Sequence, residues 1–254
     1  MTYDLTRFDL GAMLKCSPRL RESAGDAVTL EKCAQRVCRF LYDELRAPDG
    51  SRACALVRCY KTHPFGSLEP DLKEFAQKIL GSEPPKTSMK VLTLLATVGQ
   101  SPAWNSRHQS QGHRAIPLPS PEIVEKAPMI AQLIRELGFE ISTVLQPDSD
   151  VVKDIGGKRQ GVFHVESALG SPYIPAQQDF VARYNIKSVL GFGGMLPSGD
   201  LSAVILFTTV TVPNSAAERF KTLALDLRSA FSKFSETSVF EKTRPSTLSA
   251  LRPQ

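Results

Sequence analysis

The sequence predicts a single α/β domain of the α+β type, built around a central antiparallel sheet. Amphipathic helices and β-rich runs follow one another along most of the chain, with no internal repeat and no linker between two units. Two β-rich runs, residues 187–196 and 201–212, are joined by the turn sequence PSGD at 197–200. Such a pattern indicates a hairpin, and a hairpin requires antiparallel strands.

The first part of the chain predicts an arm, a helix and a strand. Residues 1–25 show no sustained periodicity, and we expect an irregular arm there. A helix is expected from residue 26, because apolar residues recur at three- and four-residue steps from Leu30 to Leu45. The turn sequence APDG at 47–50 ends this helix, and a strand is expected over 52–61.

The middle of the chain predicts a buried strand followed by an unusually long loop. A short amphipathic helix over 71–80 precedes a nearly continuous apolar run at 89–98, which is typical of a central strand. Residues 99–121 hold the only Trp, two of the four His and four of the 18 Pro. Loops of this length inside a compact domain are more often functional than not. A helix over 121–137 and a short strand over 139–145 are expected next.

The last part of the chain predicts a surface loop, a strand, a short helix and a final long helix. The polar stretch 148–160 contains two adjacent glycines and is expected to be a surface loop. Residues 161–167 predict a strand and 175–184 a short helix, before the hairpin described above. The final helix is expected over 215–234, with its apolar residues in one stripe.

This order of elements resembles a GAF domain. The resemblance is strongest over residues 184–207 (YNIKSVLGFGGMLPSGDLSAVILF), where GAF domains have a similar strand–turn–strand phrase at the sheet centre. The resemblance covers roughly residues 26–236. The chain also resembles the free-standing or N-terminal sensory segments of bacterial two-component signalling proteins. It implies a GAF-like central antiparallel sheet, with terminal helices on one face and a loop-covered ligand pocket on the other. The long 99–121 loop departs from the family pattern, and residues 237–254 are expected to be a disordered tail.

Composition excludes several classes of protein. The net charge of +5 is spread along the chain without a block of five like charges, so we expect no nucleic-acid binding. No stretch of about 18 apolar residues indicates a membrane span, and residues 1–10 lack the apolar core of a signal peptide. A cytoplasmic location is therefore expected. Five cysteines, an odd number, argue against a disulfide framework.

The candidate ligand-binding residues gather in the long loop. Trp104, Arg107, His108, His113 and Arg114 combine an aromatic face with cationic donors, which suits an acidic or planar ligand. The alternative is an exposed loop that binds nothing. The two histidines of this loop lack the spacing of a zinc module.

Two further candidates lie later in the chain. His164 stands between Phe163 and Val165 in the expected strand, so its side chain is expected on the opposite face to theirs. In that place it could ligate haem iron, which makes haem the first candidate among otherwise unknown cofactors. The alternative is a structural histidine whose hydrogen bonds are satisfied by the protein. Tyr173 is a candidate for the pocket wall.

These features favour a sensory domain that binds a small molecule and acts through a partner protein such as a histidine kinase. The terminal helices suggest a homodimer, as is common in the family that the chain resembles. We expect no enzymatic activity. One alternative is a cysteine-dependent reductase on a GAF fold, although no cysteine follows Cys59, and Cys54 and Cys59 are expected on opposite faces of their strand. The other alternative is a protein-interaction scaffold with an empty pocket.

Overall fold

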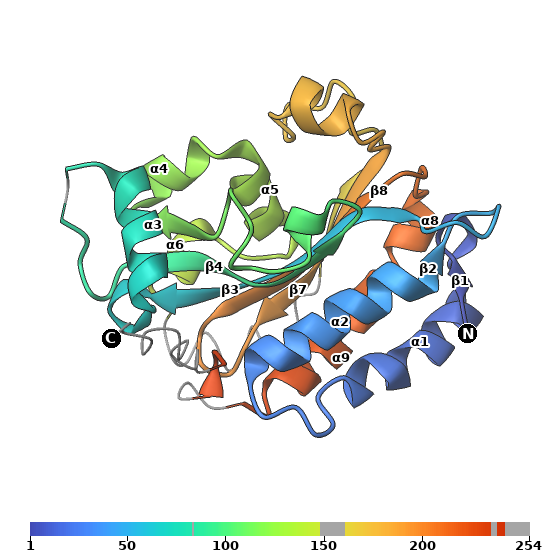
Figure 1. Ribbon diagram of the computed structural model, residues 1–254, viewed down its shortest axis with the longest axis horizontal. Helices are drawn as coiled ribbons and strands as arrows, with labels where there is room; N and C mark the ends of the chain where they lie inside the picture. Colours follow the sequence, from blue (N-terminus) through green and yellow to red (C-terminus); the bar gives the residue numbers. More distant parts are fainter. Residues whose placement is uncertain (83, 148–160, 235–237, 242–254) are drawn as a thin grey trace, which may run out of the picture.

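The centre of the molecule is an antiparallel sheet of six strands in the order β5-β4-β3-β8-β7-β6 (Figure 1). The computed structural model describes residues 1–82, 84–147, 161–234 and 238–241. The six strands are β3 (Cys54–Pro64), β4 (Lys90–Gly99), β5 (Ala115–Leu118), β6 (Val162–Val165), β7 (Ser188–Met195) and β8 (Leu201–Thr208). The predicted antiparallel fold, including the 187–212 hairpin, is confirmed.

Helices cover both faces of this sheet, so that it forms the middle of three layers (Figure 1). One face is covered by α1 (Leu10–Glu22), α2 (Leu30–Glu44) and α9 (Phe220–Phe231), with α8 (Asn214–Ala217) leading into the last of these. The other face is covered by α4 (Pro121–Glu125), α5 (Pro128–Glu136) and α6 (Ile141–Leu145), while α3 (Pro70–Leu80) packs beside β5. The central antiparallel sheet and the terminal helices on one of its faces are as expected, whereas the other face is covered mainly by helices and not by loops over a ligand pocket. Across the described ranges, no helix has the length and apolar character needed to cross a bilayer.

Short elements complete the fold. They are the two-residue strands β1 (Tyr3–Asp4) and β2 (Leu45–Arg46), the 3-10 turns η1 (Leu5–Arg7), η2 (Phe65–Ser67) and η3 (Pro102–Trp104), and the π-helical turn η4 (Gln177–Ala182). The strands β1 and β2 pair in parallel, so the first residues of the chain lie beside the end of α2. The side chain of Gln177 donates hydrogen bonds to the carbonyls of Ala168 and Ile174, which closes the loop before η4.

The prediction of an irregular arm over residues 1–25 is wrong, because most of it is α1. Asp9 caps this helix by accepting a hydrogen bond from the N–H of Ala12. The buried residues Met13, Cys16 and Leu20 face the helical layer. The periodicity of this helix is obscured in the sequence because exposed leucines lie off the buried face and a proline lies within the helix.

Three other expectations near the long loop are corrected. Residues 139–145, expected as a strand, contain α6, whose Ile141 and Val144 are buried one helical turn apart. The expected helix over 121–137 is two helices, because Pro128 lacks an N–H and holds Ala127 outside helical geometry. The expected loop over 99–121 contains the edge strand β5, in which a proline is tolerated.

The two faces of the sheet carry separate cores, and a β-bulge changes which residues each one receives. Cys54 and Cys59 both belong to the core under α1, α2 and α9, whereas opposite faces were expected. The reason is a register shift between Cys54 and Leu56, which places Ala55 and Leu56 together on the other face. All five cysteines are free, buried and part of the same core.

The glycines of the hairpin serve close packing. A Cβ at Gly193 would lie 2.1 Å from the carbonyl oxygen of Ser202, so only glycine fits beside β8. Gly199 has φ +79° in the hairpin turn, where its N–H donates to the carbonyl of Leu196. The glycine-rich sequence at 191–194 therefore supports strand packing.

Several regions bear on the remaining predictions. Residues 238–241 pack against α2 and Val239 is buried, so the expected disordered tail is wrong for these four residues. The rest of that tail and the expected loop at 148–160 lie outside the described residues.

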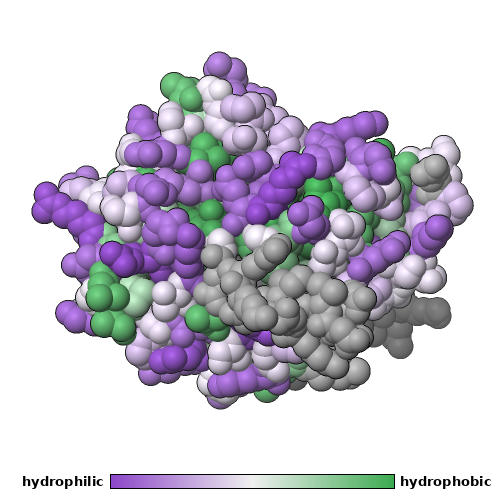
Figure 2. All heavy atoms as spheres, turned by 180° about the vertical axis from the view of Figure 1, so that it is seen from behind, coloured by the Kyte–Doolittle hydropathy of each residue, from purple (hydrophilic) through white to green (hydrophobic). Residues whose placement is uncertain are grey.

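Seen from behind, the surface is mostly hydrophilic, and its hydrophobic residues lie in separate patches (Figure 2).

Candidate functional site

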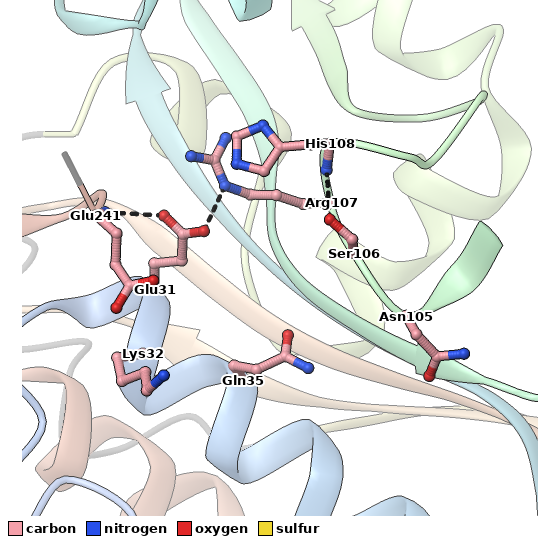
Figure 3. Close-up of a pocket in the computed structure, with 8 residues that line it drawn as sticks. All are labelled: Glu31, Lys32, Gln35, Asn105, Ser106, Arg107, His108 and Glu241. Atoms are coloured by element: carbon pink, nitrogen blue, oxygen red, sulfur yellow. Dashed lines mark hydrogen bonds and ion pairs between the residues drawn. The ribbon is translucent and has the colours of Figure 1, made fainter. Parts of the chain in front are cut away.

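A polar groove lies between the N-terminal half of α2 and the long segment that links β4 to β5 (Figure 3). Its volume is about 410 Å³, within the range of small-molecule sites. It is lined by residues of three segments that are distant in sequence: Glu31, Lys32, Gln35, Asn105, Ser106, Arg107, His108 and Glu241. Two of them, Arg107 and His108, were predicted as ligand-binding residues.

Arg107 anchors the long segment to the rest of the protein. Its side chain is 3% exposed, with Nε 2.7 Å from Oε1 of Glu31 and Nη2 2.9 Å from Oε2 of Glu69. The ring of Phe240 lies under the guanidinium, 4.8 Å from Cζ. Burial opposes the charge of Arg107, but the two carboxylates outweigh it and raise the pKa of the guanidinium above its usual value. Its Nη1 is buried without a hydrogen-bond partner among the described residues.

Glu31 joins the groove to the C-terminal segment. One carboxylate oxygen accepts from Arg107, and the other accepts from the backbone N–H of Glu241 at 3.0 Å (Figure 3). The backbone N–H of Glu31 donates in turn to the carbonyl of Val239 at 2.8 Å. A change in the position of Glu31 would therefore change the hydrogen bonds that hold residues 238–241.

Asn105 gives the wall of the groove a fixed conformation. Its Nδ2 donates to the carbonyls of Gly99 and Ser101, both at 3.0 Å, and its Oδ1 accepts from the N–H of Gly99 at 3.3 Å. These bonds close the turn at the start of the segment. The groove is thus preorganised by backbone contacts, which favours ligand binding.

Three side chains of the groove have hydrogen-bonding capacity to spare. Lys32 and His108 are exposed and Gln35 is partly buried, and none has a side-chain hydrogen bond or ion pair within the described part of the chain. Lys32 and Gln35 extend from α2, while the ring of His108 lies beside Arg107 on the long segment (Figure 3). Together they offer an ammonium, an amide and an imidazole to one ligand.

Trp104 lies on the opposite side of the segment from Arg107. Its ring packs on Tyr184, with centroids 4.4 Å apart, and on Phe180 at 5.8 Å. These rings join the second core, on the α4–α6 face of the sheet. Trp104 is therefore a packing residue that holds the segment in place, and it is not part of the groove.

The remaining predicted residues are not brought together. Arg114 forms an ion pair with Asp71 beside α3, and His113 is exposed with φ +59°. Tyr173 is exposed in the loop before η4. His164 points away from Phe163 and Val165, as predicted, but this orientation takes it out of the second core.

The expectation that His164 ligates haem iron is not supported by its surroundings. Its Nε2 lies 2.9 Å from the carbonyl oxygen of Val212, and its backbone N–H donates to Glu136 at 2.9 Å. The alternative interpretation, a structural histidine with a protein partner, describes this position. Within the described ranges, no three His, Cys, Asp or Glu side chains are grouped to hold a metal ion.

Sequence reasoning did not identify Glu31, Lys32, Gln35 or Glu241 as site residues. The polar side of the expected helix over 26–45 included Glu31 and Lys32, but such a side is usually only solvated. The decisive information is the contact with Arg107, which lies 76 residues away in sequence from Glu31.

Comparison with known proteins gives matches among solved structures and none among sequences. No protein-family model and no curated protein matches the sequence. Among solved structures, the phycoerythrobilin-bound GAF domain from a cyanobacterial phytochrome matches with a TM-score of 0.41 and 12% identity, covering 92% of this chain and 97% of that chain. Because this similarity is low, the fold assignment rests on the strand order and the layers described above.

Proposed function

We propose that this protein is a cytoplasmic sensory domain of bacterial signal transduction that binds a small molecule in the α2 groove. The observation that carries the proposal is the position of Glu31, which contacts both the long segment and residues 238–241 from the wall of the groove. A ligand that moves α2 or the long segment changes these contacts. The C-terminal segment then passes the change to a partner such as a histidine kinase.

The chemistry of the groove favours a compact polar ligand that carries both hydrogen-bond donors and acceptors. Lys32 supplies a cation, His108 supplies an imidazole, and Gln35 supplies an amide that both donates and accepts. Carboxylates are present as well, because Glu31 shares the charge of Arg107 with Glu69 and Glu241 also lines the groove.

A thermal-shift screen with amino acids, nucleotides and dicarboxylates tests this site. We expect one class to raise the Tm of the wild type, and we expect Lys32→Met and His108→Ala to weaken that effect. His113→Ala is the matched control, since it removes an exposed histidine of the same segment outside the groove. Equal responses from His108→Ala and the wild type would place the ligand elsewhere.

Transmission is tested separately by hydrogen exchange. Ligand binding is expected to change the exchange of the Glu241 N–H, which is bonded to Glu31. Unchanged exchange in a protein that does bind the ligand would remove the signalling part of the proposal and leave the binding part.

A homodimer is the second part of the proposal, supported by exposed leucines on the helical layer. Leu10 and Leu14 of α1 are 53% and 60% exposed, and Leu225 of the adjacent α9 is 43% exposed. Light scattering is expected to give a dimer mass that Leu14→Asp halves. Ile79→Asp, which changes an exposed apolar residue of α3, is expected to leave the dimer intact. A monomeric wild type would refute the dimer.

The absence of enzymatic activity remains our proposal. A cysteine-dependent reductase needs an accessible thiolate, and the five cysteines are buried in one core. We expect no methionine sulfoxide reductase activity from the purified protein, and measurable turnover that a cysteine substitution abolishes would revive this alternative.

A further inference from the structure

A second pocket, with a different character from the α2 groove, lies at one end of the sheet. Its volume is about 740 Å³, within the usual range for small-molecule sites. It is formed where β3 and β5 end, where β4 and α4 begin, and where α6 ends. Six prolines and four larger apolar residues make up most of the wall: Pro64, Pro84, Pro85, Pro119, Pro121, Pro147, Leu80, Met89, Leu118 and Leu145.

The charged side chains that line this pocket in the described part of the chain are all positive. Lys86 and Lys90 line it, and none of its described lining residues is acidic. The Lys90 side chain is 10% exposed, and Nζ lies 2.6 Å from Oδ1 of Asp200. An ammonium has three N–H donors, and only this one bond of Lys90 is formed within the described residues. Lys90 therefore presents hydrogen-bond donors in a largely apolar environment.

Asp200 fixes the position of the Lys90 ammonium. Both of its carboxylate oxygens already have other partners, so it does not accept further hydrogen bonds from Lys90. Its Oδ2 accepts from Lys61 at 2.7 Å and from Ser198 at 2.9 Å, and Thr62 lies 3.4 Å from Oδ1. The carboxylate is 4% exposed and belongs to the hairpin turn. Since these partners hold Asp200 in place, Lys90 is preorganised for a second anion.

We propose that this pocket binds an amphiphilic carboxylate, with its carboxylate on the Lys90 ammonium and its hydrocarbon body among the prolines and leucines. An uncharged hydrocarbon would leave the donors of Lys90 without a partner in an apolar site, which disfavours it. A small hydrophilic anion would not use the apolar wall. The site is separate from the α2 groove and does not depend on the function proposed for it.

Methyl NMR of the full chain with ¹³C-labelled methionine tests the proposal with decanoate, below its micellar concentration. Met89 lines the pocket, whereas Met13 is buried in α1 on the other side of the sheet. Decanoate is expected to shift the Met89 signal saturably and leave Met13 unchanged. Decan-1-ol and acetate, which each lack one half of the ligand, are expected to bind at least about tenfold more weakly.

Variants then assign the carboxylate contact. Lys90→Met is expected to weaken decanoate binding about tenfold, Lys90→Arg to retain it within about threefold, and Lys86→Met to have the smaller effect of an exposed charge. Equal binding of decanoate and decan-1-ol to the wild type, or no saturable shift of Met89, would overturn the proposal. This comparison needs no variant, so it decides the question even if Lys90→Met does not fold.

Discussion

Nε of Arg107 lies 2.7 Å from Oε1 of Glu31, and this contact joins the long segment to the first turn of α2. Both side chains are largely buried, at 3% and 13% exposure. The pair is therefore screened little by solvent, unlike the Arg114–Asp71 pair of the same segment, in which Asp71 is 45% exposed.

Replacement of Arg107 is expected to be costly. Arg107→Met leaves the carboxylates of Glu31 and Glu69 without their partner, and we expect the free energy of unfolding in urea to fall by about 2–4 kcal/mol. Arg114→Met is the matched control, because its partner Asp71 is 45% exposed, and a loss of at most about 1 kcal/mol is expected. Similar losses in both variants would mean that Arg107 is not the anchor of the segment.

His63 is expected to make stability depend on pH. Burial, and after it the charge of Lys61, lowers the pKa of His63 from 6.5 to about 3. Between these values the unfolded chain binds a proton that the folded protein does not, so stability is lost as pH falls below about 6.5. The difference in unfolding free energy between the wild type and His63→Leu should change by up to about 1.4 kcal/mol per pH unit between about pH 6 and 4. A difference that is constant over this range would contradict the buried neutral imidazole.

Replacement of Asp200, in the turn of the hairpin, is expected to lower the stability of the protein strongly. Burial alone would raise its pKa, but Lys61 and Lys90 outweigh this effect and lower it, so Asp200 is charged at neutral pH. Asp200→Asn weakens its contacts with two buried ammonium groups, and we expect a loss of about 3 kcal/mol or more in urea unfolding. Asp71→Asn is the exposed counterpart and should lose about 1 kcal/mol or less. A small loss for Asp200→Asn would show that the cluster is solvated.

The cysteines are expected to be unreactive in the folded protein. Burial raises the pKa of Cys16, Cys33 and Cys54 to about 12, and a thiol reacts as its thiolate. An aromatic disulfide reagent at about pH 8 should therefore label the native protein only as fast as it opens, and all five thiols at once in urea. Immediate labelling of one thiol in the native protein would refute this expectation.

The elements that could be predicted are those whose pattern is local. The hairpin, β4 and α2 each have a sequence pattern that is complete within one segment: a turn between two β-rich runs, a continuous apolar run and a helical periodicity. The strand expected over 139–145 was wrong. The element there is α6, and its five residues are too few to distinguish a helix from a strand without knowing what covers them. A bulge cannot be seen in a sequence either, which is why Cys54 was placed on the wrong face.

The site was less predictable than the fold, because contacts across the chain define it. The length and composition of the long segment directed attention to Arg107 and His108, and the structure places both in the wall of the groove. The same reasoning included Trp104, which packs into the core, because a sequence does not show to which side of a loop a residue points. Glu31 could not be paired with Arg107 without the structure.

The order of strands in the sheet has a consequence for biosynthesis. The strand β3 pairs with β8, and Lys61 and Asp200, which meet at this pair, are separated by 139 residues. Closing so large a loop is slow, and β3 cannot find this neighbour until β8 has left the ribosome. During translation, one edge of β3 therefore stays unpaired until β8 has been made.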